Sequence, residues 1–235
     1  MSGRPVCSAA AQRMAKEALS EMHEVIRVGM SEKEIADAVC SLMRSRGSGP
    51  WWYHGVGALV LLGKRTVLSV SARDYAPDPE NRVSENDVIT VDCSPTLAGY
   101  WGDYARTFFM ENGVLAPEDS PLLPENRRAM EAELHLHEYL LYNLDPDMTY
   151  GEAYEILDGV IRGMGYVNLD FHGNLGHSVE RDPKDRVWLE KGNPLTFREV
   201  GKPFTLEPHI RRAEGGHGYK REDIYYVDGD RFARL

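Results

Sequence analysis

The chain has 235 residues, 42% of them hydrophobic, and a formal net charge of -10 at pH 7. This length suffices for one large domain or two small ones, with a core that buries roughly 70% of the unfolded chain's surface. A nucleic-acid-binding surface needs clustered basic residues, so the acidic balance predicts no nucleic-acid partner. We expect the acidity to reflect a solvated surface together with a carboxylate site.

The cysteines and the apolar runs indicate where the protein works. Cys7, Cys40 and Cys93 show neither CxxC spacing nor a small disulfide framework, so they predict no structural zinc and no oxidising compartment. The N-terminus has no apolar signal-peptide region, and no apolar run approaches the roughly 20 residues that span a bilayer. These features predict a cytoplasmic protein without a membrane partner.

Helix signals open the chain. Apolar residues recur at helical spacing from Pro5 to about Val28, and Gly29 ends the pattern. Ser31 followed by Glu34 forms a capping box, which predicts a second helix ending at Gly47.

Strands and one long helix are expected further along. A Pro-rich connection over 116–124 precedes a predicted helix from Glu125 to about Asn143, which Asp145-Pro146 ends. The polar stretch Ser71–Asn86 is predicted to be a surface loop near the mouth of the site. The predicted strands are Ala58–Leu62, Thr66–Val70, Val88–Cys93, Tyr104–Met110, Phe204–Glu207 and Ile224–Val227.

Two segments of the chain align without a gap at an offset of 118 residues. They share a capping box, a helix of equal length and a terminal aromatic-His-Gly. Such a combination indicates a duplicated half-domain, with pseudo-repeats over about 30–110 and 148–230 inside a single domain covering 1–235. The offset pairs Ser31 with Thr149, Glu34 with Glu152, Gly47 with Gly165, Tyr53 with Phe171, His54 with His172 and Gly55 with Gly173.

Each half ends in an acidic pair at a candidate β-hairpin. A hairpin folded symmetrically about Leu97 and Ala98 would place Asp92 opposite Asp103, and Glu207 and Glu222 form the second pair. Directly opposed residues have Cβ atoms about 5 Å apart, where like charges are destabilising unless something neutralises them. A divalent cation is the simplest neutraliser.

His177 adds an imidazole between the two acidic pairs. Carboxylates with one imidazole and no thiolate suit hard to borderline divalent ions such as Mn, Co, Fe or Zn. Two such ions roughly 3.5 to 4 Å apart, bridged by carboxylates, lower the pKa of a bound water enough to make hydroxide near neutral pH. The sequence therefore predicts a hydrolase with two divalent metal ions.

Four segments, 92–108, 175–179, 204–210 and 220–227, carry a resemblance to a known family. Together they resemble the pita-bread metallopeptidase superfamily of methionine aminopeptidases, prolidases, aminopeptidase P and creatinase, with the order Asp, Asp, His, Glu, Glu matched in full. The resemblance covers residues 5 to 230 and implies an α+β pita-bread fold with internal pseudosymmetry.

The resemblance also implies a role for each ligand. Asp92 would chelate one metal ion, Asp103 and Glu222 would bridge both ions, and His177 and Glu207 would complete the shell of the second. Glu207 would also serve in proton transfer.

Two positions depart from the family pattern. Methionine aminopeptidases carry a His about eighteen residues before the first Asp, where this chain has Asp74. They and the prolidases carry a second His seven residues after the ligand His, where this chain has Lys184. Four other histidines are candidates to replace these substrate-contacting groups, and His209 is favoured because it shares a strand face with Glu207. The candidates are His54, His172, His209 and His217.

Two further residues are candidates for substrate binding. Trp101, directly before Gly102-Asp103, is the aromatic side chain favoured for the substrate pocket, and His217 is the second candidate for substrate binding. His54 and His172 equally suit a packing role at corresponding corners of the two halves.

Three functions are compatible with this pattern. The first is a metal-dependent exopeptidase that acts on small peptides, as an aminopeptidase or an Xaa-Pro dipeptidase. The second is a hydrolase or lyase that acts on a small non-peptide metabolite. The third is a non-catalytic peptide-binding module, which usually loses ligands that this chain keeps. A homodimer is an assembly that the resemblance allows.

Overall fold

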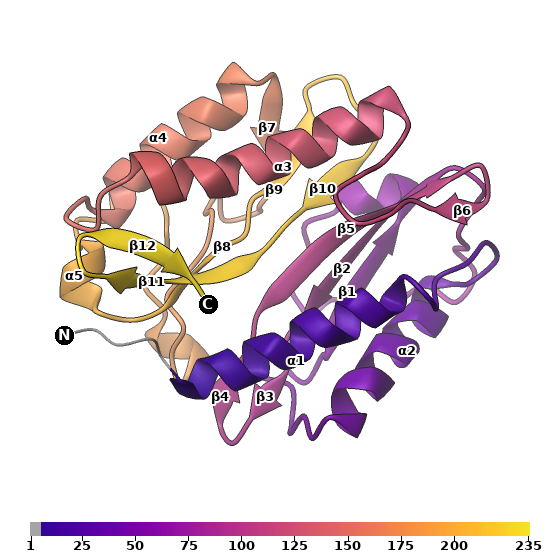
Figure 1. Ribbon diagram of the computed structural model, residues 1–235, viewed down its shortest axis with the longest axis horizontal. Helices are drawn as coiled ribbons and strands as arrows, with labels where there is room; N and C mark the ends of the chain where they lie inside the picture. The colour runs from indigo at the N-terminus through magenta and orange to yellow at the C-terminus, as the bar shows by residue number, and fades with distance from the viewer. Residues whose placement is uncertain (1–5) are drawn as a thin grey trace.

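The computed structural model describes residues 6–235, so the predicted helix start at Pro5 lies outside the described residues (Figure 1). Four long helices and the strands behind them form two halves. The helices are α1 (Val6–Met22), α2 (Glu32–Ser45), α3 (Pro124–Asn143), α4 (Tyr150–Gly163) and α5 (Phe197–Val200), with 3-10 turns η1 (Gly63–Val67) and η2 (Pro183–Asp185). The strands are β1 (Ala58–Leu62), β2 (Asp87–Cys93), β3 (Thr96–Leu97), β4 (Tyr100–Trp101), β5 (Tyr104–Glu111), β6 (Val114–Leu115), β7 (Tyr166–Asn168), β8 (Phe204–Leu206), β9 (His209–Arg212), β10 (Gly218–Lys220), β11 (Asp223–Asp228) and β12 (Arg231–Arg234).

The first half packs α1 and α2 against a four-stranded antiparallel sheet of order β1-β2-β5-β6 (Figure 1). Helix α2 starts at the predicted capping box, in which Ser31 and Glu34 bond to each other's backbone N–H. Its apolar face buries Ile35, Val39 and Met43 against the sheet. All five residues of β1 are buried, which is why this segment reads as a continuous apolar run.

The second half repeats this local pattern with α3 and α4 over two three-stranded sheets, of order β10-β9-β7 and β12-β11-β8. The predicted capping box of Thr149 and Glu152 is present at the start of α4. Helices α2 and α4 begin and end at positions 118 residues apart, and Gly47 and Gly165 follow them with positive φ angles of 90° and 82°. These correspondences fit the duplication, which itself stays a prediction.

Most predicted elements have the bounds that the sequence indicates. Helix α3 and five of the six predicted strands agree with the structure to within one residue at each end. The first helix ends at Met22, before the predicted Val28. The predicted strand Thr66–Val70 is wrong, because Thr66 Oγ1 donates to the carbonyl of Gly63 at 2.6 Å and closes the turn η1.

The register of the first acidic hairpin differs from the prediction. Ala98 and Gly99 occupy the turn with φ of 51° and 80°, so the hairpin is centred one residue later than expected. Asp92 therefore pairs with Ala105, and Asp103 lies diagonally across from Asp92 instead of directly opposite. Diagonal neighbours still share a face of the hairpin, so the two carboxylates remain close.

The second acidic pair joins two ladders of common register. Asp223 pairs with Leu206, and Lys220 pairs with His209, so this register sets Glu222 opposite Glu207 where the two ladders meet. A β-bridge between Ala105 and Glu222 links this hairpin to β5 of the first half. The bridge brings the two acidic pairs together from distant parts of the sequence.

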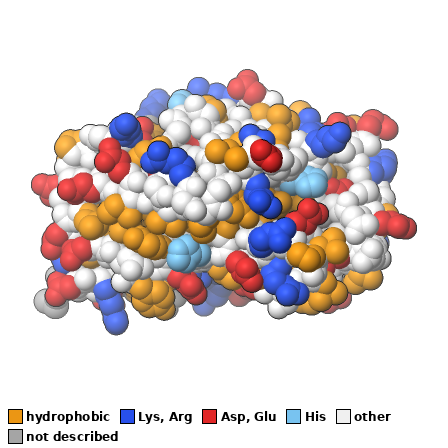
Figure 2. All heavy atoms as spheres, turned by 90° about the horizontal axis from the view of Figure 1, so that it is seen from above, with side chains coloured by type: hydrophobic (Ala, Val, Ile, Leu, Met, Phe, Trp, Pro, Cys, Tyr) orange, Lys and Arg blue, Asp and Glu red, His pale blue; other side chains and the backbone are white. Residues whose placement is uncertain are grey.

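The surface of the described chain mixes charge types. The face in Figure 2 shows acidic and basic side chains around a band of hydrophobic ones, with several Lys and Arg side chains gathered toward one end. Among the helices of residues 6–235, none has both the length and the apolar character required to cross a membrane.

Candidate active site

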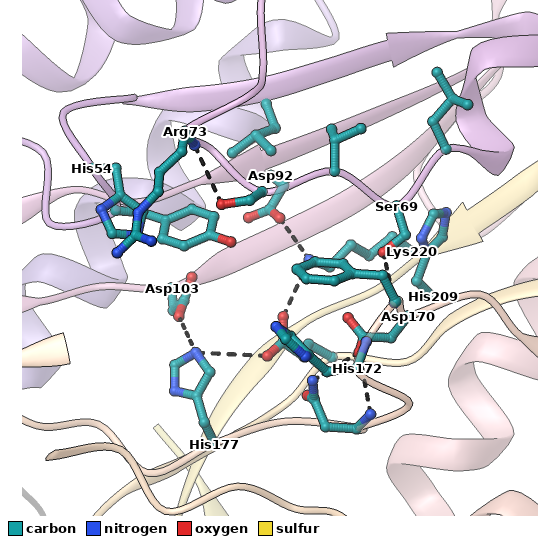
Figure 3. A pocket seen from close by; sticks show the side chains of 18 of the residues that line it. His54, Ser69, Arg73, Asp92, Asp103, Asp170, His172, His177, His209 and Lys220 are labelled. Carbon is teal, nitrogen blue, oxygen red and sulfur yellow. Dashed lines mark hydrogen bonds and ion pairs between the residues drawn. The ribbon is translucent and has the colours of Figure 1, made fainter. Parts of the chain in front are cut away.

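A cavity of about 420 Å³ opens where the two halves meet (Figure 3). Its walls come from β1 and β2 of the first half and from the 170–177 segment, β9 and β10 of the second. Asp92, Asp103, His177 and Glu207 all line it, so four of the five predicted metal ligands face one space. The predicted loop 71–86 contributes its first part to the mouth.

The carboxylates of Asp92, Asp103 and Glu222 form the centre of the site. Each offers an oxygen within 4.8 Å of the oxygens offered by the other two. Glu222 is fully buried, and neither of its carboxylate oxygens has a hydrogen-bond partner among the described residues. Buried carboxylate oxygens without partners are costly, and a divalent cation at this point would satisfy them.

His177 presents an unprotonated nitrogen to the same centre. Its Nδ1–H donates to the backbone carbonyl of Ser178 at 3.0 Å, which leaves the lone pair on Nε2. Nε2 lies 3.6 Å from both Asp103 Oδ2 and Glu207 Oε1, too far for a hydrogen bond. Burial lowers the pKa of His177 to about 4, so the ring is neutral and suited to bind a metal.

Gly176 fixes the backbone that carries this imidazole. A Cβ at this position would lie 2.1 Å from the carbonyl oxygen of Thr205 in the neighbouring strand. The Thr205 hydroxyl in turn accepts a hydrogen bond from the His177 N–H at 3.0 Å. The Gly-His pair of the sequence thus reflects a close approach of two backbones beside the site.

Lys220 is a site residue that the sequence reasoning missed. Its ammonium lies 2.6 Å from Asp92 Oδ2 and 3.2 Å from Glu207 Oε2, so it joins the two halves across the cavity. The signal was available, because Lys220 stands two residues before Glu222 and residues two apart on a strand share a face.

The carboxylates differ in proton affinity. Burial, followed by the neighbouring carboxylates, raises the pKa of Asp103 and of Glu222 well above the ordinary range. Burial alone would also raise the pKa of Glu207, but the ammonium of Lys220 and the other nearby charges outweigh it and lower that pKa. The crowded negative charge fits a centre built for cations, and Glu207 is the member best held in the ionised form.

Three of the four candidate outer histidines line the cavity: His54, His172 and His209. His209 is nearly buried, and its Nε2 bonds the carbonyl of Thr66 at 2.7 Å. Burial lowers the pKa of His209 to about 4, so its ring is neutral at physiological pH. His217 is not among the described residues that line the cavity, because it lies in the connection between β9 and β10.

Asp74 and Lys184, the two positions that depart from the family pattern, differ in their relation to the cavity. Asp74 lines the cavity, whereas Lys184 lies in η2 and does not line it. An acidic group therefore stands at the mouth in place of the first expected imidazole.

Trp101 does not line the cavity, contrary to the prediction. It is 3% exposed, and its ring stacks on that of Trp52 with centroids 4.4 Å apart. Trp52 is the ring that faces the cavity, together with Tyr53 and Trp188. The aromatic wall therefore exists, but Trp101 supports it from behind.

Comparisons with known proteins agree with this site. The sequence model of metallopeptidase family M24 matches residues 7–229. The chain is 26% identical over 215 residues to a methionine aminopeptidase of Helicobacter pylori (strain J99), a match that covers 87% of this chain and 78% of that protein. The chain therefore belongs to metallopeptidase family M24.

Solved structures define the fold. Prolidase from Pyrococcus furiosus superposes with a TM-score of 0.77 at 22% identity, over 97% of this chain and 62% of that one. Methionine aminopeptidase from Thermotoga maritima gives 0.77 at 16% identity, over 100% and 98%. The chain thus spans about three fifths of the prolidase and nearly all of that aminopeptidase. These similarities confirm the α+β pita-bread fold, and the family confirms the expectation of a metal-dependent peptidase.

Proposed function

We propose that the chain is an exopeptidase that uses two divalent metal ions. Asp92 would hold one ion, His177 and Glu207 the other, and Asp103 and Glu222 both. The observation that carries the proposal is the pair of buried, unpartnered oxygens of Glu222 among other carboxylates and a neutral imidazole. When bound, divalent ions polarise the scissile carbonyl and activate water at neutral pH.

The chain's own groups supply proton handling and orientation. Glu207, with its lowered pKa, is a carboxylate at neutral pH and accepts a proton from the attacking water. Lys220 holds that carboxylate at 3.2 Å and keeps it in place. His209 lines the cavity beside Glu207, where we propose that it contacts the substrate, with His54 and His172 as further contacts.

The proposed substrate is a short peptide with a free N-terminus, cleaved as by an aminopeptidase or an Xaa-Pro dipeptidase. Relatives named methionine aminopeptidase and prolidase support this class. An apolar wall of the cavity, with Leu59, Leu61, Leu68 and Val70, suits a hydrophobic or proline side chain. We propose manganese as the metal and the cytoplasm as the place of action.

A second candidate is a hydrolase or lyase for a small non-peptide metabolite on the same scaffold. Asp74 favours it, because this acidic group lines the cavity at the position where methionine aminopeptidases carry an outer histidine. Turnover of a polar metabolite without turnover of any peptide would support this candidate.

The test is a panel of di- and tripeptides incubated with the manganese-, cobalt- or zinc-loaded protein, with release of free amino acids as the readout. We expect release that a chelator abolishes and added metal restores. Asp103→Ala should remove activity, whereas the matched control Asp228→Asn, an exposed carboxylate on β11, should keep it. Unchanged activity in Asp103→Ala would overturn the proposal.

A further inference from the structure

Two guanidinium groups on the cavity wall have no carboxylate partner. Arg73 and Arg186 both line the cavity, and neither forms an ion pair with any residue in the described range 6–235. In a chain of net charge -10, unpaired cations beside a carboxylate-rich centre stand out. Such cations are typical of a subsite for an anionic part of a ligand.

Arg186 is held in place by its surroundings. Its Nε–H donates to the carbonyl of Pro183 at 2.8 Å, and its guanidinium lies 4.4 Å from the ring centre of Trp188 and 5.5 Å from that of Trp52. Cation–π contact with two indoles and the bond to Pro183 restrict where the guanidinium can move, while its terminal nitrogens make no hydrogen bond with residues 6–235. The side chain is thus held in place before a carboxylate arrives, with terminal nitrogens free to bind it.

The aromatic wall links this guanidinium to the proposed metal centre. The ring of Trp188 contacts the ring of His177 edge-on, with centroids 5.4 Å apart. The guanidinium-to-Trp188 and Trp188-to-His177 distances share the Trp188 ring, so the Arg186 guanidinium lies within about 10 Å of the His177 ring. Roughly three residues of extended peptide span this distance. A peptide cleaved at the centre would place its C-terminus here only if it were short.

Arg73 extends the cationic end of the cavity, and the His54 ring lies beside it. Figure 3 shows the Arg73 guanidinium beside the His54 ring at one end of the cavity. The ring of His54 lies 5.2 Å from that of Tyr53, which is itself 6.0 Å from the Arg186 guanidinium. Burial lowers the pKa of His54, and the charges of Arg73 and Arg186 lower it further, which agrees with their closeness.

We propose that Arg186, supported by Arg73 and His54, binds the C-terminal carboxylate of a di- or tripeptide. This inference rests on the proposed exopeptidase function and narrows it, since it excludes the long N-termini of proteins as good substrates. Arg186 is then a specificity residue that contacts the substrate, with a role separate from the metal ligands.

The kinetic test compares peptides that differ only at the C-terminus. Ala-Ala and Ala-Ala-amide are assayed with the metal-loaded protein, next to Arg186→Met and the matched control Arg181→Met. Arg181 is an exposed guanidinium of the same segment, bonded to the Tyr100 hydroxyl. We expect the protein to prefer the acid over the amide by about 10- to 100-fold in kcat/KM, the usual size of a charged hydrogen-bond contact. Arg186→Met should bring the ratio close to one, and Arg181→Met should not change it.

Further arms separate the outcomes. Equal rates for acid and amide in the unmodified protein would overturn the subsite, as would an equal loss on both peptides in Arg186→Met at unchanged melting temperature and metal content. Arg73→Met, which removes a side chain that makes no hydrogen bond or ion pair within residues 6–235, should lower the ratio in part. Preference for Ala-Asp-amide over Ala-Ala would show that the group recognises an acidic side chain instead and would overturn the C-terminal assignment.

A binding measurement distinguishes failure of this inference from failure of the proposed function. The probes are Ala-Ala with its peptide bond reduced to a methyleneamine, as the free acid and as the amide, titrated calorimetrically into the metal-loaded protein. If no peptide is hydrolysed but the acid probe binds at least 10-fold tighter and Arg186→Met abolishes the difference, the anion subsite stands without peptidase activity. Hydrolysis with no difference between the probes would leave the function and remove the subsite.

Discussion

Replacing Glu222 by Gln tests the charge crowding at the centre of the site. The oxygens of Asp92, Asp103 and Glu222 lie within 4.8 Å of one another. Two unit charges at this distance repel by about 3 kcal/mol at an effective dielectric constant of 20. The raised folded-state pKa of Glu222 expresses this repulsion together with burial. A carboxylate of this kind contributes stability at pH values below its ordinary pKa of 4.5, and this stability is lost as pH rises through the folded-state pKa.

At pH 8, the metal-free Gln variant should therefore be more stable than the unmodified protein by about 2 kcal/mol, or roughly 4 to 8 °C in melting temperature. Manganese at 100 times its dissociation constant should stabilise the unmodified protein by about 2.7 kcal/mol. The variant should lose most of that gain, because it lacks a ligand oxygen. The substitution thus acts with opposite sign in the absence and presence of metal.

The assay is differential scanning fluorimetry at pH 8 with chelator or manganese, with calorimetry for the enthalpy. Glu214→Gln, an exposed carboxylate near the β9–β10 connection, is the matched control and should leave both melting temperatures unchanged. A Gln variant that is less stable without metal, or that keeps the full manganese shift, would refute the reasoning.

Three further substitutions test other parts of the structure. Burial raises the pKa of Glu133 to about 7, so the buried carboxylate costs stability once it ionises. The free energy of unfolding of Glu133→Gln, measured in urea, should therefore rise relative to that of the unmodified protein by up to about 3 kcal/mol between pH 5 and pH 8. A difference that stays constant with pH would contradict this. Gly176→Ala should cost about 3 kcal/mol or more and abolish the manganese-induced melting shift, because its Cβ meets a backbone carbonyl, whereas Gly159→Ala, with open space, should be neutral or stabilising. Lys220→Met should destabilise the metal-free protein by about 3 kcal/mol in the same urea assay, and a loss under about 1 kcal/mol would show that Asp92 does not depend on this ammonium.

Local signals predicted the elements well where each residue's neighbours in sequence decide the structure. The capping boxes at Ser31 and Thr149 marked both helix starts, because a cap is a contact over three residues. Ala58–Leu62 was readable as a strand because burial on both faces selects an apolar run. Thr66–Val70 contains three β-branched residues, which favour a strand, yet a side-chain hydrogen bond from Thr66 to Gly63 turns the chain there.

The hairpin register shows how turn chemistry limits such reasoning. Placing the turn at Leu97-Ala98 made Asp92 and Asp103 direct partners, whereas Gly99 admits a positive φ and moves the turn one residue on. The carboxylates stayed on one face because the side-chain period of a hairpin is two. Their proximity was therefore predictable, although their pairing was not.

The partners that each half finds in the other lay beyond the sequence signals, which could place Lys220 on the face of Glu222 but could not name its ion-pair partners. The ion pairs of Lys220 join residues 128 and 13 positions away, and the burial of Trp101 depends on Trp52 from another segment. The predicted order Asp, Asp, His, Glu, Glu named the side chains at the centre of the site. It did not indicate which cations and rings surround them, because those positions follow from packing between halves.

The central claim is that the four carboxylates and His177 form a two-metal centre. The most direct measurement is elemental analysis of the protein after manganese loading and gel filtration, alongside Glu222→Gln and the Glu214→Gln control. The structure predicts about two ions per chain in the unmodified protein and in the control, and fewer than one in Glu222→Gln. A metal-free unmodified protein, or equal metal content in Glu222→Gln, would contradict the claim.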